Sequence, residues 1–136
     1  MNKKRIVVDA RIIGTGTGNY AEGVLDELQK IDKFNDYIIV LDPAAKWRPS
    51  PKAKNFSVYS SKNTARVHTF FVRGNINLAF ELYKLKADVF WASYQFVPYF
   101  FRHKNIILTV HDLTQLRIGN VKSLSLIHIS EPTRPY

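Results

Sequence analysis

The chain has 136 residues, of which 46% are apolar and 23% charged, and it contains no cysteine. This length suffices for one domain with its own hydrophobic core. The lack of cysteine excludes disulfides, thiolate metal sites and a cysteine nucleophile. No apolar run reaches the roughly 20 residues of a membrane-spanning helix, and the run after the basic start ends at Asp9, too early for a signal peptide. We therefore expect a cytoplasmic protein.

The charge balance favours anionic partners. Twenty lysines and arginines against eleven acidic residues give a net charge of +9 at pH 7. Two groups of cations accompany aromatic rings: Lys46, Arg48, Lys52 and Lys54 around Trp47, and Arg102, His103 and Lys104 after Tyr99, Phe100 and Phe101. Such groups suit an acidic membrane surface or single-stranded nucleic acid, and a solvated basic face is the alternative.

The first third of the chain predicts a strand, a glycine loop and a helix. The β-branched run that ends at Asp9 indicates a strand buried on both faces of a parallel sheet. Glycines follow at positions 14, 16 and 18, and Asn19 with Glu22 has the spacing of a capping box. Apolar residues then recur at helical spacing, namely Ala21, Val24, Leu25, Leu28 and Ile31.

Four more strands and a second helix are expected further along. The strands are predicted over residues 37–41, 55–59, 88–92 and 106–110. The proline-rich basic stretch from Pro43 to Asn55 predicts a surface loop, and the dense apolar residues before Lys86 predict a helix from about Asn75. This alternation predicts an α/β protein with a Rossmann-like, doubly wound parallel sheet of strand order 3-2-1-4-5.

The end of the chain differs in character from the rest. Residues 124–134 (LSLIHISEPTR) resemble one reading frame of a transposon-end adapter used to prepare sequencing libraries, and all eleven residues match. The resemblance implies a domain over residues 1–123 and an artefactual or disordered tail over residues 124–136. On this interpretation the domain is a fragment of a longer parent.

The strand order places a candidate site where it reverses, between the first and fourth strands. The glycine loop, the segment 93–95 after the fourth strand, and His111–Asp112 after the fifth are expected to converge there. A glycine loop before a helix N-terminus suits a phosphate or a sugar hydroxyl. No Gly-Lys-Ser/Thr follows the glycines, which excludes a mononucleotide P-loop.

His111 is the candidate catalytic side chain. An imidazole at this place could donate to a sugar hydroxyl or a phosphate oxygen, and the alternative is a histidine held by backbone groups. Adjacent strand residues point to opposite faces, so His111 and Asp112 are not expected to hydrogen-bond each other. The other histidines, His68, His103 and His128, have no partner at metal-ligand spacing, and no metal site is predicted.

Taken in order, four motifs resemble the N-terminal half of the retaining glycosyltransferases of family 4. They are residues 7–11 (VVDAR), 14–20 (GTGTGNY), 88–92 (DVFWA) with Pro98, and 109–113 (TVHDL). The resemblance covers residues 4–115 and is strongest at the TVHDL motif. Proteins of this family have the GT-B architecture, in which two Rossmann-like domains face a cleft. This chain resembles the half that mainly holds the acceptor.

The resemblance implies transfer of a sugar from a nucleotide-sugar to a glycan or lipid-linked acceptor, with retention at the anomeric carbon. It places His111 against the transferred sugar as the catalytic residue. The substrate-binding positions that it implies are Gly16, Gly18, Tyr20, Arg11, Tyr94 and Asp112. No cofactor is implied besides the donor, and the partners expected are the two substrates and an anionic inner membrane face, with no specific nucleic acid. Because the family's donor half is missing, the chain alone is expected to be inactive.

Two other functions compete with this one. Residues 16–21 satisfy the Gly-x-Gly-x-x-Ala fingerprint of NAD(P)-binding domains, and Asp42 stands where a ribose-binding acid is expected. That fingerprint normally begins at the strand's end, whereas Gly16 stands seven residues past Asp9. A basic module that binds membrane or nucleic acid without catalysis is the other candidate, and it leaves the glycine loop and His111 unexplained.

Overall fold

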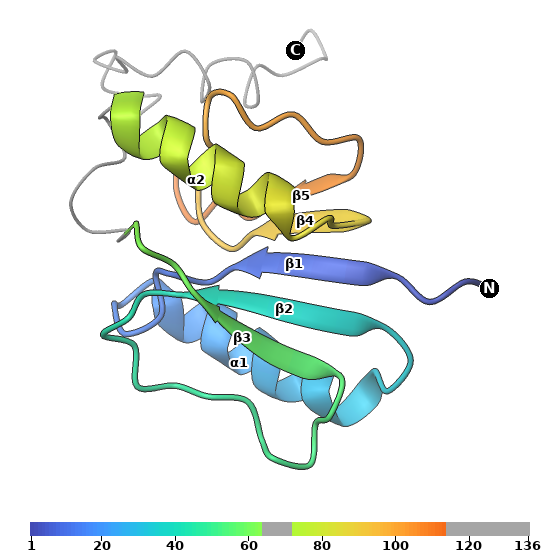
Figure 1. Cartoon of the computed structure of the whole chain (residues 1–136). Helices are drawn as coiled ribbons and strands as arrows, with labels where there is room; N and C mark the ends of the chain where they lie inside the picture. Colours follow the sequence, from blue (N-terminus) through green and yellow to red (C-terminus); the bar gives the residue numbers. More distant parts are fainter. Residues whose placement is uncertain (64–71, 114–136) are drawn as a thin grey trace, which may run out of the picture.

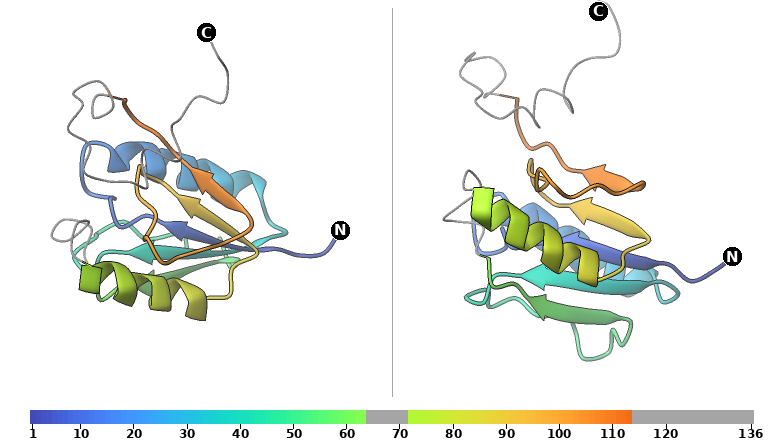
Figure 2. Two further views of the ribbon diagram at one scale, coloured as in Figure 1. Left: turned by 90° about the horizontal axis from the view of Figure 1, so that it is seen from above. Right: turned by 45° about the horizontal axis from the view of Figure 1, so that its top comes forward.

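A computed structural model describes residues 1–63 and 72–113 and contains a five-stranded, all-parallel sheet (Figure 1). The strands are β1 (Arg5–Asp9), β2 (Asp36–Leu41), β3 (Phe56–Ser60), β4 (Val89–Ala92) and β5 (Ile106–Leu108). The helices are α1 (Gly18–Ile31) and α2 (Val72–Lys84), one on each face of the sheet (Figure 2). The strand order β3-β2-β1-β4-β5 confirms the predicted α/β class and topology. Within the described ranges, neither helix combines the length and the apolar composition that crossing a bilayer demands.

Some sequence predictions fall on residues that the structure does not describe. His68 lies in residues 64–71, and both His128 and the tail over residues 124–136 lie in residues 114–136. These predictions lie outside the described residues.

Both faces of β1 are buried, as its continuous β-branched run predicts. Val8 packs on the α1 side with Ile39 and Leu25, and Val7 packs on the α2 side with Phe90 and other apolar residues. Each of these side chains is almost fully buried. Alternate residues of one strand therefore hold two separate apolar layers, and the strand is fixed in register between β2 and β4.

The capping box predicted at Asn19 and Glu22 is wrong. Helix α1 begins at Gly18 after the N-cap residue Thr17, so Asn19 already lies in the first turn. The chain enters the helix through a preceding turn, in which the Gly18 N–H donates to the carbonyl oxygen of Thr15 at 3.0 Å. The side chain of Thr17 makes no capping hydrogen bond, but the Thr15 hydroxyl accepts from the Gly18 N–H at 3.3 Å.

Two other boundaries differ from the sequence prediction. Helix α2 begins at Val72, three residues before Asn75, and continues through Gly74. Strand β5 ends at Leu108, two residues early, although the Thr109 N–H still donates to the Ala92 carbonyl at 3.0 Å. Because β5 is the last strand of the described sheet, its apolar residues stand partly exposed.

The loop over residues 43–55 is confirmed as irregular, but part of it is anchored. Ala45 and Ala53 are buried in the α1-side core, and Trp47 packs against the same core. The Trp47 Nε1–H donates to the Asp26 carboxylate of α1 at 3.1 Å. Trp47 therefore fastens the loop to α1.

The three glycines of the loop between β1 and α1 have different roles. Gly14 has a φ of 95°, which favours glycine. At Gly18, a Cβ atom would stand 2.2 Å from the Ile12 carbonyl oxygen, so no side chain fits between these backbone segments. At Gly16, a Cβ atom would meet no heavy atom within 4 Å, and the residue has no positive φ. The fold thus explains two of the three glycines.

We predict that Gly18→Ala lowers the free energy of unfolding by about 1–3 kcal/mol, because the added methyl meets backbone that cannot move aside. Gly23→Ala is the matched control. It lies inside α1 with open space around it and is expected to stabilise the protein by about 0.5–1 kcal/mol. Urea unfolding measures the free energy of unfolding of both variants. A Gly18→Ala protein as stable as the unsubstituted chain would contradict the close approach of Gly18 to the Ile12 carbonyl.

Candidate functional site

The carboxyl ends of β1 and β4 lie side by side where the strand order reverses (Figure 1). Asp9 ends β1 and is paired in register with Ala92, the last residue of β4. The next residue, Ser93, donates its hydroxyl to the Asp9 carbonyl at 2.7 Å. This is the position at which open parallel sheets bind ligands.

A buried ion pair holds the end of β1. The Arg11 guanidinium donates from Nε to Asp9 Oδ1 at 2.8 Å and from Nη2 to Asp9 Oδ2 at 2.9 Å. Its Nη1 donates to the Asn63 carbonyl at 2.9 Å, and its Nη2 also donates to the Tyr94 hydroxyl at 2.7 Å. One guanidinium therefore ties together the segments that follow β1, β3 and β4.

The surroundings of this pair keep Arg11 charged and Tyr94 protonated. Burial alone lowers the pKa of Arg11, but the Asp9 carboxylate and the Tyr94 hydroxyl offset this and leave the pKa raised. Burial, together with the charge of Asp9, holds the pKa of Tyr94 well above its ordinary value. The Tyr94 hydroxyl donates to Asp9 Oδ2 at 3.2 Å. In this structure the polar atoms of Arg11 and Tyr94 face each other and Asp9. A contact of either residue with a substrate stays a prediction.

The loop between β1 and α1 presents backbone N–H groups at the same edge. Its turns are closed by hydrogen bonds from Ile13 to Ala10, from Thr15 to Ile12 and from Gly18 to Thr15. Within the described ranges, the N–H groups of Gly16 and Thr17 donate to no protein group. Gly16 is exposed, and α1 begins two residues later with the positive end of its dipole. This arrangement can bind an anion.

His111 lies against the start of α1. Its ring meets the Tyr20 ring edge-on, with the ring centroids 5.5 Å apart. Its Nε2 lies 2.9 Å from the Ser93 carbonyl oxygen. A carbonyl only accepts hydrogen bonds, so Nε2 carries the proton, and in the neutral ring Nδ1 is an acceptor. No group in the described part of the chain donates to Nδ1.

The structure therefore brings together most of the predicted site. Gly16, Gly18, Tyr20 and His111 lie around one edge, and Arg11 and Tyr94 form the buried cluster beneath it. Asp112 is exposed, and its backbone carbonyl accepts a hydrogen bond from the Gln95 side chain. Whether any of these residues binds a substrate stays a prediction.

Two contacts of this cluster were not predicted: the pairing of Asp9 with Arg11, and the hydrogen bond between His111 and the carbonyl of Ser93, a residue of the segment 93–95 that was expected at this edge. The Asp-x-Arg spacing is a signal for the first, because residues two apart in an extended segment share a face. No sequence signal points to the Ser93 carbonyl, since any residue carries one.

A groove of about 480 Å³ runs from Tyr20 along α1. Its lining residues are Asn19, Tyr20, Gly23, Val24, Glu27, Leu28 and Ile31. Most of this lining is apolar, so the groove offers a sugar few hydrogen-bonding groups. The polar groups of the site are those of the glycine loop and His111.

The ring of His103 is held in place by backbone groups and by a neighbouring aromatic ring. Its Nε2–H donates to the Ala87 carbonyl at 2.8 Å, its Nδ1 accepts from the Asn105 N–H at 3.1 Å, and its ring stacks on Phe101. Over residues 1–63 and 72–113, no group of three or more acidic or histidine side chains is placed to hold a metal ion.

No protein-family model, curated protein or solved structure matches this chain. The resemblance to family-4 glycosyltransferases therefore depends on the four sequence motifs alone.

We predict that Arg11→Met lowers the free energy of unfolding by about 3–5 kcal/mol, because it leaves the Asp9 carboxylate buried without its cation. The double variant Asp9→Asn/Arg11→Met removes both charges and should recover part of this loss. Chemical unfolding of both proteins measures how much of the lost stability the second substitution restores. A double variant no more stable than Arg11→Met would show that the pair does not act as a unit.

Proposed function

We propose that this chain is the acceptor-side half of a retaining glycosyltransferase with the GT-B architecture. The observation that carries the proposal is the contact between Tyr20, at the start of α1, and His111, after β5. With this contact, the backbone N–H groups of the glycine loop and the imidazole of His111 lie at the same edge of the sheet, which supports the proposal.

The glycine loop is suited to a negatively charged group. The N–H groups of Gly16 and Thr17 point to no protein acceptor in the described residues, and the α1 dipole adds partial positive charge. Gly16 is also the loop glycine that the fold does not require. Close approach of a ligand to the backbone gives a reason for glycine there.

In the proposed reaction, the bond between the anomeric carbon and the donor diphosphate breaks, and a bond to the acceptor oxygen forms on the same face of the sugar. The acceptor's proton leaves with the diphosphate. Catalysis then depends on stabilising the departing charge and on positioning. The loop N–H groups serve the first purpose. His111, held by Ser93 and Tyr20, serves the second when its Nδ1 accepts a hydrogen bond from a sugar hydroxyl.

The NAD(P)-binding alternative has less support. Gly18, the second glycine of its fingerprint, is the one expected to leave room for a pyrophosphate. Here the space beside Gly18 is filled by the Ile12 carbonyl. The carboxylate of Asp42 accepts a hydrogen bond from the Ala44 N–H at 2.9 Å within its own turn.

We expect UDP-glucose or GDP-mannose, titrated into the isotope-labelled chain, to shift the amide signals of Gly16 and Thr17 and the ring signals of His111. Gly16→Ala should weaken this binding about ten-fold, which corresponds to loss of roughly 1.4 kcal/mol. Gly23→Ala, which also adds a methyl in open space, should leave it unchanged.

His111→Gln separates positioning from folding. Its side-chain amide can still donate to the Ser93 carbonyl, but its acceptor Oε1 lies one bond further along the side chain than Nδ1. Binding should therefore weaken while the melting temperature stays near that of the unsubstituted chain. Shifts confined to other segments, or tighter binding of NAD than of either nucleotide-sugar, would overturn the proposal.

A further inference from the structure

Four aromatic side chains stand exposed on the α2 side of the molecule. Phe80 and Tyr83 belong to α2, and Tyr99 and Phe100 belong to the loop between β4 and β5. Phe80 is 62% exposed and Phe100 is 56% exposed. Single exposed aromatic residues are common on protein surfaces, so the question is whether these four form one surface.

Hydrogen bonds join the two elements at Tyr83. Its hydroxyl donates to the Phe100 carbonyl at 3.0 Å and accepts from the Arg102 N–H at 2.8 Å. The Tyr83 ring also packs on Phe101, which is buried in the α2-side core. Phe80 lies three residues before Tyr83, on the neighbouring part of the helix surface. The four rings therefore lie on two elements that are fixed against each other.

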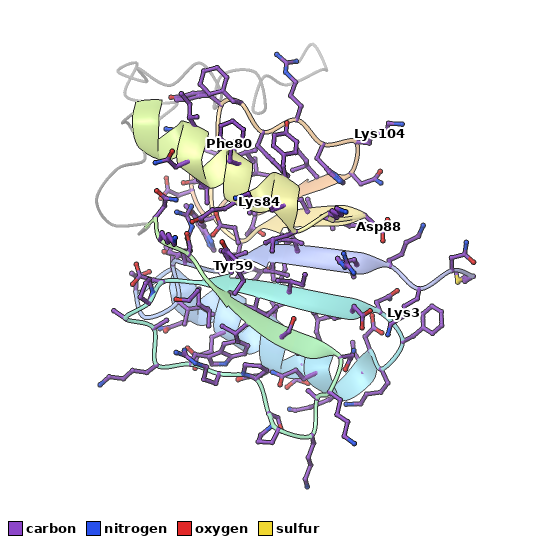
Figure 3. The ribbon with its side chains drawn as sticks, viewed as in Figure 1. Lys3, Tyr59, Phe80, Lys84, Asp88 and Lys104 are labelled. Carbon is purple, nitrogen blue, oxygen red and sulfur yellow. The ribbon has the colours of Figure 1, made fainter. Side chains whose placement is uncertain are left out.

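Cations accompany these rings. Lys84 follows Phe80 by one helical turn (Figure 3). Arg102 and Lys104 follow Phe100 in the loop between β4 and β5. Two carboxylates lie nearby and keep their charge: Glu81 accepts from the Ser61 hydroxyl and the Lys62 N–H, and Asp88 accepts from the Arg5 N–H. The three cations exceed these two carboxylates by one. We call the four rings with Lys84, Arg102 and Lys104 the aromatic–basic surface.

The other basic group, around Trp47, differs because its aromatic ring packs against the core. Lys46, Arg48, Lys52 and Lys54 are at least partly exposed, but Trp47 packs against the α1-side core and donates to Asp26. That ring holds its loop in place. The two groups therefore carry similar charge, but the aromatic–basic surface also presents phenylalanine rings to solvent.

We propose that the aromatic–basic surface docks on an anionic lipid bilayer. A phenylalanine ring has no polar group and gains by entering the boundary of the acyl chains, while tyrosine is suited to the headgroup region. Lysine and arginine beside the rings attract anionic lipids. These features favour a bilayer over nucleic acid, which would use stacking along a basic groove. The proposal does not depend on the proposed transferase reaction.

The test is cosedimentation of the whole chain with vesicles of phosphatidylcholine containing about one-third phosphatidylserine. We expect binding to these vesicles and little binding to pure phosphatidylcholine. Lys84→Gln/Lys104→Gln should weaken binding about 25-fold, at roughly five-fold for each cation. Phe80→Ala/Phe100→Ala should weaken it about ten-fold and make the remainder more sensitive to salt.

Matched control variants remove lysine charges and an exposed aromatic ring outside the aromatic–basic surface. Lys46→Gln/Lys52→Gln removes two charges from the other basic group, and Phe34→Ala removes an exposed ring between α1 and β2. Both should weaken binding far less than the variants of the aromatic–basic surface, with melting temperatures compared for all four. Equal losses in the controls, equal binding to uncharged vesicles, or binding to a single-stranded oligonucleotide without binding to vesicles would each overturn the proposal.

Discussion

The buried pair of Asp9 and Arg11 is the interaction on which the arrangement of the site depends. Neither charge is stable in the interior without the other, because removing an ion from water costs several kcal/mol unless a partner and hydrogen bonds replace the solvent. The chain after β1 must therefore turn so that Arg11 returns to Asp9, and the same guanidinium fixes Asn63 and Tyr94. Three segments far apart in the sequence are positioned by one cation.

The rest of the site follows from the sheet. Pairing of β1 with β4 and of β4 with β5 brings Ser93 and His111 to the same edge as Asp9. The turn after Arg11 then starts α1 close enough for Tyr20 to meet the His111 ring, and Gly18 permits the close backbone approach that this turn needs. The exposed parts of the loop stand above the buried, hydrogen-bonded ion pair of Asp9 and Arg11. In the proposed function, this ion pair would keep the N–H groups oriented before a ligand arrives, which is how preorganised sites gain affinity and rate.

Periodicity and strand order allowed the fold to be predicted, because β-branched runs buried on both faces and a helix with an apolar stripe leave few ways to arrange a parallel sheet. The convergence of the glycine loop with His111 followed from that order. The start of α1 could not be predicted from Asn19 and Glu22, since a turn at Thr15 leads into the helix earlier. The burial of Arg11 could not be predicted from the sequence either, because it depends on Asn63 and Tyr94, which the fold brings to the end of β1 from distant parts of the chain. The sequence suggested that Trp47 belongs to a basic surface group, whereas its ring packs against the α1-side core and its Nε1–H donates to Asp26.

The most direct test of the central claim is the proximity of Tyr20 and His111 in solution. With ring centroids 5.5 Å apart in an edge-on arrangement, nuclear Overhauser effects should connect the ring protons of the two residues. The nitrogen shifts of His111 should also identify the tautomer that carries its proton at Nε2. A folded chain that shows no contact between the two rings, with His111 protonated at Nδ1, would contradict the account.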